Sequence, residues 1–158
     1  MKLEEQEFLL EVAKLAAARS TAVRLKVGAV VADQAGNLIA TGYNGSIRGA
    51  DNCLEDKVYS TSSEQRLGYY LHDSGGWYKL VTKESTIHAE QNLIAHAARR
   101  GISINNSVVF VTHSPCGKCV PLLIQAGVAE VIYIDLHCSL DQVITDYGHR
   151  IKLTKWKT

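Results

Sequence analysis

One stretch of the chain decides the fold. Residues 88–119 read HAEQNLIAHAARRGISINNSVVFVTHSPCGKC. Its first part, 88–100, is strongly helical in composition, and Gly101 is a typical residue for the end of a helix. The apolar run 108–112 predicts a buried strand, and 116–126 predicts a second helix. A helix, a strand and a helix in succession are typical of a layered α/β domain.

The same alternation extends to both sides of this stretch. Its members are a helix over about 4–19, a strand at 27–32, a turn at 33–37, a strand at 38–43, a strand at 131–134, a helix around 139–147 and a short edge strand near 150–153. Residues 44–86 differ, because they are rich in Gly, Ser, Asp and Tyr and show no sustained period. Long segments of this kind are usually functional or mobile. We therefore expect one α/β domain over residues 1–158, with an insertion at about 44–86.

The composition favours a compact protein with a small-molecule ligand. The chain has 158 residues, 46% of them hydrophobic, and 17 Lys+Arg against 16 Asp+Glu leave a net charge of +1. Proteins that wrap nucleic acid carry a basic excess, so we expect no nucleic-acid partner. We also expect no membrane partner, because no apolar run approaches the roughly 18 residues of a spanning helix, and the acidic N-terminus is unlike a signal peptide. Four cysteines, two of them in a CxxC pair, predict reduced thiols, metal binding and a cytoplasmic location.

Three side chains of the 88–119 stretch have the chemistry of a catalytic zinc site. Thiolates from Cys116 and Cys119 and the imidazole of His88 would fill three tetrahedral positions and leave the fourth for water. Glu90, two residues after the histidine, is then free to move protons instead of binding metal. An H-x-E pattern followed by P-C-x-x-C is the signature of zinc nucleobase deaminases.

Both halves of this pattern are expected at helix N-termini. Free backbone N–H groups and the helix dipole favour anions there. Cys116 and Cys119, at positions i and i+3, would share one face of a helix and reach the same ion. Zinc lowers the pKa of water from about 15.7 toward about 7, so water would be activated at neutral pH.

Two other interpretations of these residues stay open. A CxxC that follows a strand also occurs in thiol-redox proteins of the thioredoxin type. That fold places a cis-proline beside the cysteines from a later strand, whereas Pro115 and Pro121 both belong to the predicted CxxC helix. A non-catalytic regulator that binds zinc and nucleotide is the second alternative, although it would have no need of Glu90.

Together with Val27-Gly-Ala-Val30 and Gly42-Tyr-Asn-Gly45, the zinc pattern resembles the deoxycytidylate (dCMP) deaminase family, in particular its phage-type members. The similarity runs from about residue 12 to about residue 135, interrupted by the 44–86 region. It implies a cytidine-deaminase-like fold, a three-layer α/β/α sandwich around a five-stranded mixed sheet. It also implies Zn²⁺ as cofactor and hydrolysis of dCMP to dUMP, which supplies thymidylate synthesis. Because many members are homohexamers activated by dCTP and inhibited by dTTP, the resemblance predicts a homo-oligomer, a hexamer, with these effectors.

The resemblance also assigns substrate contacts. Asn44 is similar to the residue that contacts the nucleotide sugar, and the backbone N–H of Ala89 is expected to bond the pyrimidine carbonyl. The backbone after Thr112 would face the amine. The residues that the resemblance places around the substrate are Val27, Asn44, Ala89, His113 and Ser114.

Some positions depart from the family pattern. Ser46-Ile47 follows the GYNG motif where members usually have a residue and then proline, in a loop that contributes to the effector site of allosteric members. His113 stands where an apolar residue is usual, and His137 replaces a common aromatic residue. Each histidine would either touch phosphate or only occupy the rim of the site. Altered phosphate contacts would admit dCTP as well as dCMP.

Further basic and metal-binding residues lie outside the zinc pattern. The candidates for contacts with effector or substrate phosphate are Arg99, Arg48 and Lys26, each of which would otherwise be a solvated surface cation. Cys53 and His72 would form a second zinc site only with two more ligands, so a partly buried thiol is the simpler interpretation of Cys53. Cys138 has no evident partner in the sequence.

Overall fold

The computed structural model describes residues 1–60, 68–137 and 139–157. Its elements are α1 (Leu3–Ala18), β1 (Gly28–Ala32), β2 (Leu38–Tyr43), β3 (Glu55–Tyr59), β4 (Tyr70–Leu71), β5 (Trp77–Thr82), α2 (Ala89–Arg99), β6 (Val108–His113), α3 (Cys119–Gln125), β7 (Glu130–Asp135), α4 (Asp141–Tyr147) and β8 (Lys152–Lys155). Every helix and strand predicted outside 44–86 is confirmed, with ends that shift by at most three residues. In this described part of the chain, none of the helices is long and apolar enough to span a membrane.

The main sheet has five strands in the order β2-β1-β6-β7-β8. Strand β1 pairs antiparallel with β2 and with β6, whereas β6, β7 and β8 run parallel to one another. The hairpin of β1 and β2 is the one that the turn residues 33–37 predict. The mixed five-stranded sheet implied by the family resemblance is therefore confirmed.

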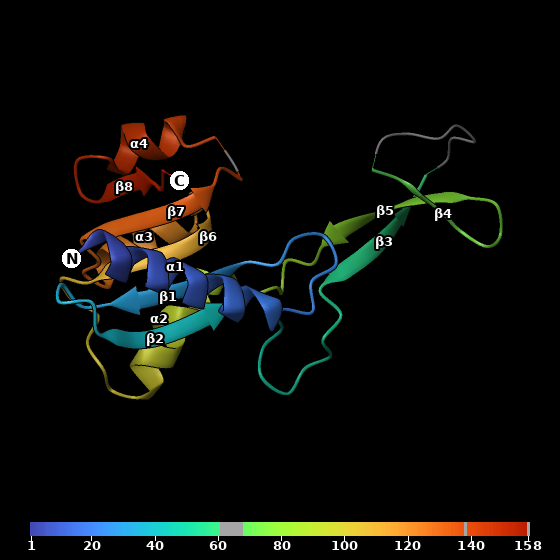
Figure 1. Ribbon diagram of the computed structural model, residues 1–158. Coiled ribbons are helices and arrows are strands. Elements are labelled where there is room, and N and C mark those ends of the chain that lie inside the picture. The colour runs from blue at the N-terminus through green and yellow to red at the C-terminus, as the bar shows by residue number, and fades with distance from the viewer. Residues whose placement is uncertain (61–67, 138, 158) are drawn as a thin grey trace.

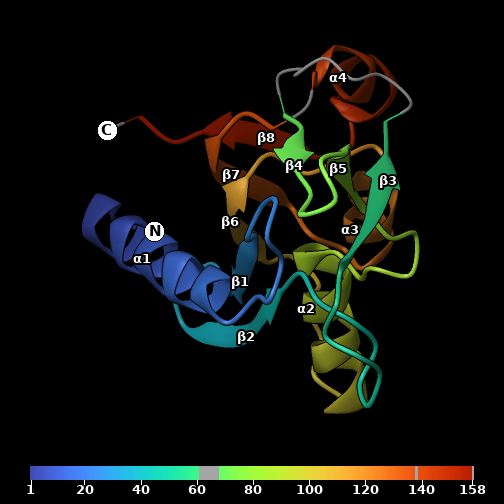
Figure 2. The same cartoon turned by 90° about the vertical axis from the view of Figure 1, so that its right-hand side faces the viewer.

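Helices cover both faces of this sheet, as the views in Figure 1 and Figure 2 show. Helix α1 packs on one face against β1, β2 and β6, while α2 and α3 cover the other. Side chains of β1 alternate between the two cores: Val30 packs under α1, and Val31 packs under α2 and α3. Strand β6 repeats the pattern with Phe110 and Val111. The apolar parts of these strands are therefore buried on both faces, which explains why residues 28–32 and 108–111 carry no polar side chain.

Two glycines allow helices to lie directly on the sheet. A Cβ atom at Gly28 of β1 would collide with the backbone of α1 at Ala13 and Ala17. A Cβ atom at Gly42 of β2 would collide with the carbonyl oxygen of Ala89 and lie 2.6 Å from the backbone nitrogen of Leu93. Because backbone atoms cannot move aside as side chains do, only glycine fits at Gly42. This contact sets the position of the first turn of α2.

Both edges of the main sheet are modified against further pairing. On the β2 edge, side chains of α2 bind strand carbonyls: Asn92 Nδ2 donates to the oxygen of Tyr43 at 2.8 Å, and His96 Nδ1 lies 2.9 Å from the oxygen of Thr41. On the opposite edge, the four-residue strand β8 carries exposed Lys152 and Lys155. Lysines and covering groups are common protections of edge strands.

The inserted segment forms a second sheet, which the sequence did not predict. Strands β3, β5 and β4 pair antiparallel in that order, and Figure 1 shows them extending away from the main sheet. We call residues 55–60 and 68–82 the arm. Rings of Tyr59, Tyr70, His72 and Tyr78 contact one another on it. Because both faces of the arm are largely exposed, its strands lack the apolar alternation that identifies a strand in sequence.

Candidate metal centre and active-site cleft

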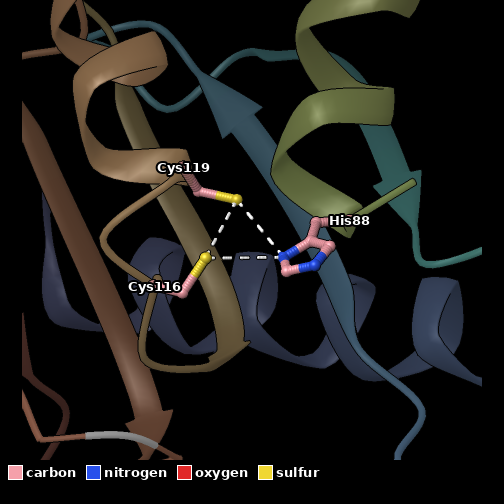
Figure 3. A group of neighbouring side chains, drawn as sticks. All are labelled: His88, Cys116 and Cys119. Carbon is pink, nitrogen blue, oxygen red and sulfur yellow. Dashed lines mark hydrogen bonds between the residues drawn. The ribbon is translucent and has the colours of Figure 1, made fainter. Parts of the chain in front are cut away.

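The metal-donor triad consists of His88, Cys116 and Cys119, drawn in Figure 3. His88 immediately precedes α2, and its backbone N–H donates to Gln91 Oε1 at 2.8 Å. Because Gln91 lies in the first turn of α2, this hydrogen bond orients the residue that carries the imidazole. The close packing of α2 on Gly42 then brings the imidazole to the carboxyl end of β6, where the cysteines follow.

The two thiols meet across a turn, which corrects the expectation that they share one helical face. Helix α3 begins at Cys119, so Cys116 lies before it. The N–H of Cys119 donates to the carbonyl oxygen of Cys116 at 3.0 Å and closes the turn. Gly117 and Lys118, between the cysteines, form this turn instead of the first turn of a helix. The sulfur atoms still come within 3.6 Å of each other.

The spacing of the three donor atoms fits tetrahedral zinc. His88 Nδ1 lies 3.5 Å from each sulfur, and the sulfurs are 3.6 Å apart. With Zn–S near 2.3 Å and Zn–N near 2.0–2.1 Å, a tetrahedral ion would separate the sulfurs by about 3.8 Å and each sulfur from nitrogen by about 3.6 Å. The residues present therefore fit a three-ligand zinc site with an open fourth position.

The pKa values of the triad side chains also favour the binding of a cation. The hydrogen bond between the thiols lowers the pKa of Cys116 and raises that of Cys119, and the hydrogen bond to Cys116 raises the pKa of His88. One thiolate is thus stabilised by protons on its neighbours. Two thiolates this close repel each other, so the remaining protons would leave only in exchange for positive charge.

Glu90 lies beside the triad and is almost completely buried. It is the second residue of α2, and 4% of its surface is exposed. Burial, which disfavours the charged carboxylate, raises its pKa to about 7. A carboxyl group with a pKa near neutrality is suited to accept a proton and to release it again.

A cleft of about 580 Å³ borders the triad and Glu90. The residues that line it are Ala22, Arg24, Leu25, Val27, Asn44, Leu54, Glu55, Thr82, Thr86, His88, Ala89, Glu90, His113, Ser114, Cys116 and His137. It therefore brings together all five residues that the resemblance places around the substrate. Arg99, Arg48 and Lys26 are exposed and do not line the described cleft. A separate hollow of about 510 Å³ beside α4 and β8 contains none of the triad.

Asn44 holds one wall of the cleft through its side-chain amide. Its Oδ1 accepts the N–H of Val27 at 2.8 Å, and its Nδ2 donates to the carbonyl oxygen of Leu25 at 2.8 Å. An amide oxygen has two acceptor sites and an amide nitrogen has two hydrogens, so one of each remains for a ligand. Contact with the nucleotide sugar stays a prediction.

His113 and His137 form a pair on another part of the cleft lining. Their rings stand edge to face, with centroids 6.2 Å apart. His113 Nδ1 lies 3.0 Å from the hydroxyl of Thr112, which accepts the N–H of Gly28. Burial lowers the pKa of His113, so the neutral imidazole is favoured. Ser114 Oγ accepts the backbone N–H of His137 at 3.0 Å and links the two segments.

Several cleft residues were not anticipated from the sequence. Leu54, Glu55, Thr82 and Thr86 come from the inserted segment, and Arg24 comes from the loop before β1. None belongs to a recognisable motif. These residues meet in one cleft because of the way the arm joins the main sheet. No local sequence pattern encodes this junction.

The structure gives no support for a second zinc site at Cys53 and His72. Cys53 is exposed, which corrects the expectation of a partly buried thiol, and its thiol donates to the carbonyl oxygen of Glu55. His72 Nδ1 lies 2.8 Å from Ser74 Oγ. Within residues 1–60, 68–137 and 139–157, the His88 triad is the only cluster of metal donors. Cys138 lies outside the described residues.

Taken together, a mixed five-stranded sheet with helices on both faces and a zinc-compatible triad next to a buried carboxyl group define a zinc-dependent deaminase. A profile of the cytidine and deoxycytidylate deaminase zinc-binding region matches residues 3–135. The chain belongs to this family.

Individual relatives agree with this assignment. The deoxycytidylate deaminase of Enterobacteria phage T4 is 31% identical over 152 residues, which cover 82% of this chain and 77% of that protein. The deoxycytidylate deaminase of Schizosaccharomyces pombe is 33% identical over 126 residues, which cover 80% of this chain. This chain spans only 35% of the length of the yeast protein. The crystal structure of dCMP deaminase from the cyanophage S-TIM5, in complex with dCMP and dUMP, has a TM-score of 0.77, 30% identity and 99% coverage of each chain.

Proposed function

We propose that this chain hydrolyses dCMP to dUMP and ammonia with Zn²⁺ as cofactor. The single observation that carries the proposal is the geometry of the metal centre: three donors 3.5–3.6 Å apart beside a carboxyl group that is only 4% exposed. Relatives that are named deoxycytidylate deaminases, and a similar structure with dCMP and dUMP bound, support dCMP as the substrate.

The triad and Glu90 would have different roles in the reaction. His88, Cys116 and Cys119 would hold the ion, which when bound supplies Lewis-acid activation of water near neutral pH. Glu90 takes a proton from the water, passes it to the ring nitrogen of cytosine and finally delivers a proton to the departing amine. One water is consumed, one ammonia leaves, and a carbonyl remains at C4 of the base.

Other cleft residues would orient the base and exclude water. By the family resemblance, the backbone N–H of Ala89 would bond the pyrimidine carbonyl, and the backbone after Thr112 would face the amine. Asn44 is hydrogen-bonded to the backbone of Val27 and Leu25 in the cleft wall. Its second amide hydrogen and the second acceptor site of its oxygen would bind the sugar. Because Glu90 is buried, bulk water does not compete for its proton. The low local dielectric also strengthens the few polar contacts that remain.

Ammonia release from a panel of dCMP, dCTP, deoxycytidine and CMP tests the proposal. We expect turnover of dCMP by the zinc-loaded protein. Activity on dCTP, which altered phosphate contacts at His113 and His137 would admit, is decided by the same panel. Tight nucleotide binding without ammonia release would favour the non-catalytic regulator. Reversible oxidation of Cys116 and Cys119 without stoichiometric zinc would favour a thiol-redox protein.

Several properties follow from the family resemblance and complete the proposal. We infer a homohexamer activated by dCTP and inhibited by dTTP, located in the cytoplasm, without nucleic-acid or membrane partners. We also infer one deaminase domain over residues 1–158 with the segment 44–86 inserted, since this segment lines the same cleft as the triad. Sedimentation with and without each effector measures the subunit number and its response.

A further inference from the structure

The first turn of α2 and the end of β2 carry the two sides of the proposed reaction. His88 immediately precedes α2, and Glu90 is the second residue of this helix. Asn44, the proposed contact of the nucleotide, follows Tyr43, the last residue of β2. A misplacement of about 1 Å between reacting groups can lower a rate by about 100-fold. The alignment of α2 along β2 therefore matters for the chemistry.

Close packing sets the distance between α2 and β2. A Cβ atom at Gly42 would collide with the carbonyl oxygen of Ala89 and lie 2.6 Å from the backbone nitrogen of Leu93. Packing is not directional, so it does not by itself fix how far the helix slides along the strand. A hydrogen bond between the two elements does fix this register, because its strength depends on distance and angle.

Asn92 supplies such a hydrogen bond. It is the fourth residue of α2 and is partly buried. Its side-chain Nδ2 donates to the carbonyl oxygen of Tyr43 at 2.8 Å, and its backbone N–H donates to the carbonyl oxygen of His88 at 2.9 Å. One residue thus connects the residue that carries the imidazole to the last residue of β2.

The carbonyl that Asn92 binds belongs to the peptide group that joins Tyr43 to Asn44. The N–H of this same peptide group donates to the carbonyl oxygen of Val27 at 3.1 Å. Because a peptide group is planar, hydrogen bonds on its two sides fix its orientation. The place of Asn44 in the cleft wall is therefore tied to α2 through Asn92.

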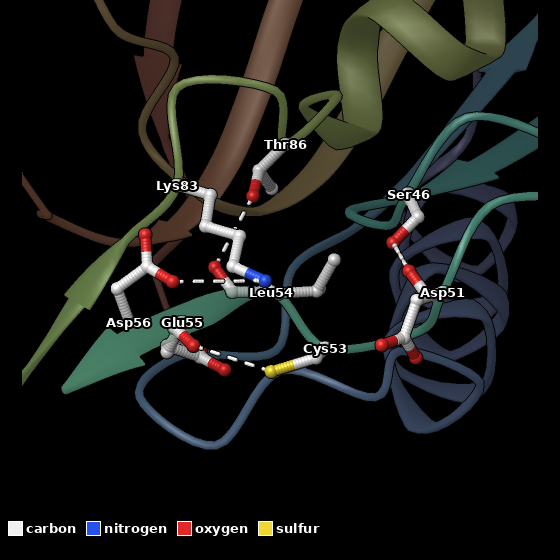
Figure 4. A network of polar contacts seen from close by, with 8 residues as sticks. All are labelled: Ser46, Asp51, Cys53, Leu54, Glu55, Asp56, Lys83 and Thr86. Atoms are coloured by element: carbon white, nitrogen blue, oxygen red, sulfur yellow. Dashed lines mark hydrogen bonds and ion pairs between the residues drawn. The ribbon is translucent and has the colours of Figure 1, made fainter.

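The chain that enters α2 is held from its other side by the inserted segment. The N–H of Ile87 donates to the carbonyl oxygen of Gly45 at 2.8 Å, and the N–H of Gly45 donates back to Ile87 at 3.0 Å. Figure 4 shows the preceding contact, in which Thr86 Oγ1 donates to the carbonyl oxygen of Leu54 at 3.3 Å. The start of α2 is thus fixed by backbone pairs on one side and by Asn92 on the other.

We propose that Asn92 is a positioning residue for the deamination: it holds the first turn of α2 in register with the end of β2, so that Glu90 meets a nucleotide bound at Asn44. The inference rests on the proposed function and extends it to a side chain outside the described cleft lining. Asn92 therefore acts through the two elements that it joins, without contact to the substrate.

The first test removes the amide and keeps an uncharged side chain of similar size. Asn92→Leu is expected to lower kcat for dCMP by about 10- to 100-fold, because Glu90 and the base are then misaligned. KM for dCMP and calorimetric binding of dUMP should change by less than about threefold, since Asn44 keeps both side-chain hydrogen bonds to the backbone.

The matched control is His96→Leu. It removes the 2.9 Å contact between His96 Nδ1 and the carbonyl oxygen of Thr41, which joins the same helix to the same strand one turn further from the metal centre. Because this contact does not reach the peptide group before Asn44, kcat should stay within about threefold of the wild-type value.

Asn92→Asp gives a readout that a loss of packing would not move. The introduced carboxylate only accepts hydrogen bonds and would face the carbonyl oxygen of Tyr43, whereas the protonated carboxyl group can donate to it as the amide does. The bond therefore favours the neutral form, and the kcat of this variant relative to wild type should rise as the pH falls from about 8 to about 5. The ratio removes the titration of groups that both proteins share.

Zinc content and the thermal unfolding midpoint separate misalignment from misfolding. Both Asn92 variants should still bind zinc, because the three ligands are retained. If Asn92→Leu fails to fold, the pH dependence of Asn92→Asp decides. A kcat of Asn92→Leu equal to that of His96→Leu, or a kcat ratio of Asn92→Asp that does not change with pH, would overturn the positioning role while leaving the deaminase intact. A wild-type protein that holds zinc but releases no ammonia from dCMP would contradict the proposed function itself.

Discussion

At the scale of residues, His88 and Glu90 show how two positions in one motif acquire different chemistry. His88 precedes α2 and faces the two thiols, whereas Glu90 lies inside the first turn and is buried. The sequence predicts a role for each of them, because the spacing within the H-x-E and C-x-x-C patterns is local. The presence of Arg24 in the cleft lining could not be predicted, because its backbone is held by Glu55, 31 residues further along the chain.

Glu90→Gln should keep zinc and lose turnover. The amide preserves the shape of the side chain but cannot carry protons, so kcat should fall by about 10²- to 10⁴-fold. Ammonia release measures the loss, and metal analysis should still give one zinc per chain. Near-normal turnover in the zinc-loaded variant would exclude Glu90 as the proton carrier.

Asp33 predicts a dependence of stability on pH far from the cleft. The Asn37 side chain, with backbone N–H groups of Asn37 and Ala35, lowers the pKa of its carboxyl group in the turn between β1 and β2. A folded pKa below the unfolded value means that this contribution is present above the unfolded pKa and is lost as pH falls through the folded one. Asp33→Ala should therefore be less stable than wild type in urea at pH 7.

The stability difference between wild type and Asp33→Ala should shrink as the solution is acidified through this range. Asp33→Asn keeps an oxygen acceptor without a titrating charge and serves as the control. Its stability difference from Asp33→Ala should stay nearly constant with pH. A gap between wild type and Asp33→Ala that widens on acidification would contradict the assignment.

At the scale of elements, the contact between β2 and the start of α2 determines where the metal donors meet. Gly42→Ala would force a Cβ atom against the backbone of Ala89 and Leu93. We expect a loss of about 3 kcal/mol in the free energy of unfolding, at the upper end of overpacking effects, together with weaker zinc binding. Urea unfolding and competition with a chelator measure both. Gly45→Ala, whose added Cβ would only make ordinary contacts near 3.7 Å, is the matched control.

The elements themselves were predictable to different degrees. Strands β1 and β6 contain continuous apolar runs, and α1 and α2 have helical composition, so local patterns identify them. The start of α3 was misplaced because Gly117 and Lys118 form a turn instead of a first helical turn. The strands of the arm were missed because they satisfy one another by backbone pairing, with little burial.

At the scale of the whole molecule, zinc would join α2 to the turn before α3, two segments about 30 residues apart in the chain that otherwise meet through packing. A ligand that binds only the folded state, at a thousandfold excess over its dissociation constant, stabilises it by about 4 kcal/mol. A chelator should therefore lower the midpoint of thermal unfolding by about 10 °C and abolish ammonia release. Added zinc should restore both. An unchanged midpoint after complete metal removal would show that the site is not part of the folded framework.

The treatment of the sheet edges has a consequence for how copies of this chain encounter one another. Asn92 and His96 already bind carbonyl oxygens on the β2 side, and β8 is short and carries exposed lysines, so both borders of the main sheet are protected against a passing strand. Recruitment of misfolded chains by templated β-pairing at the main sheet is therefore disfavoured. Assembly of copies along the main sheet would instead use side-chain surfaces, whose complementarity can be selective for its own kind.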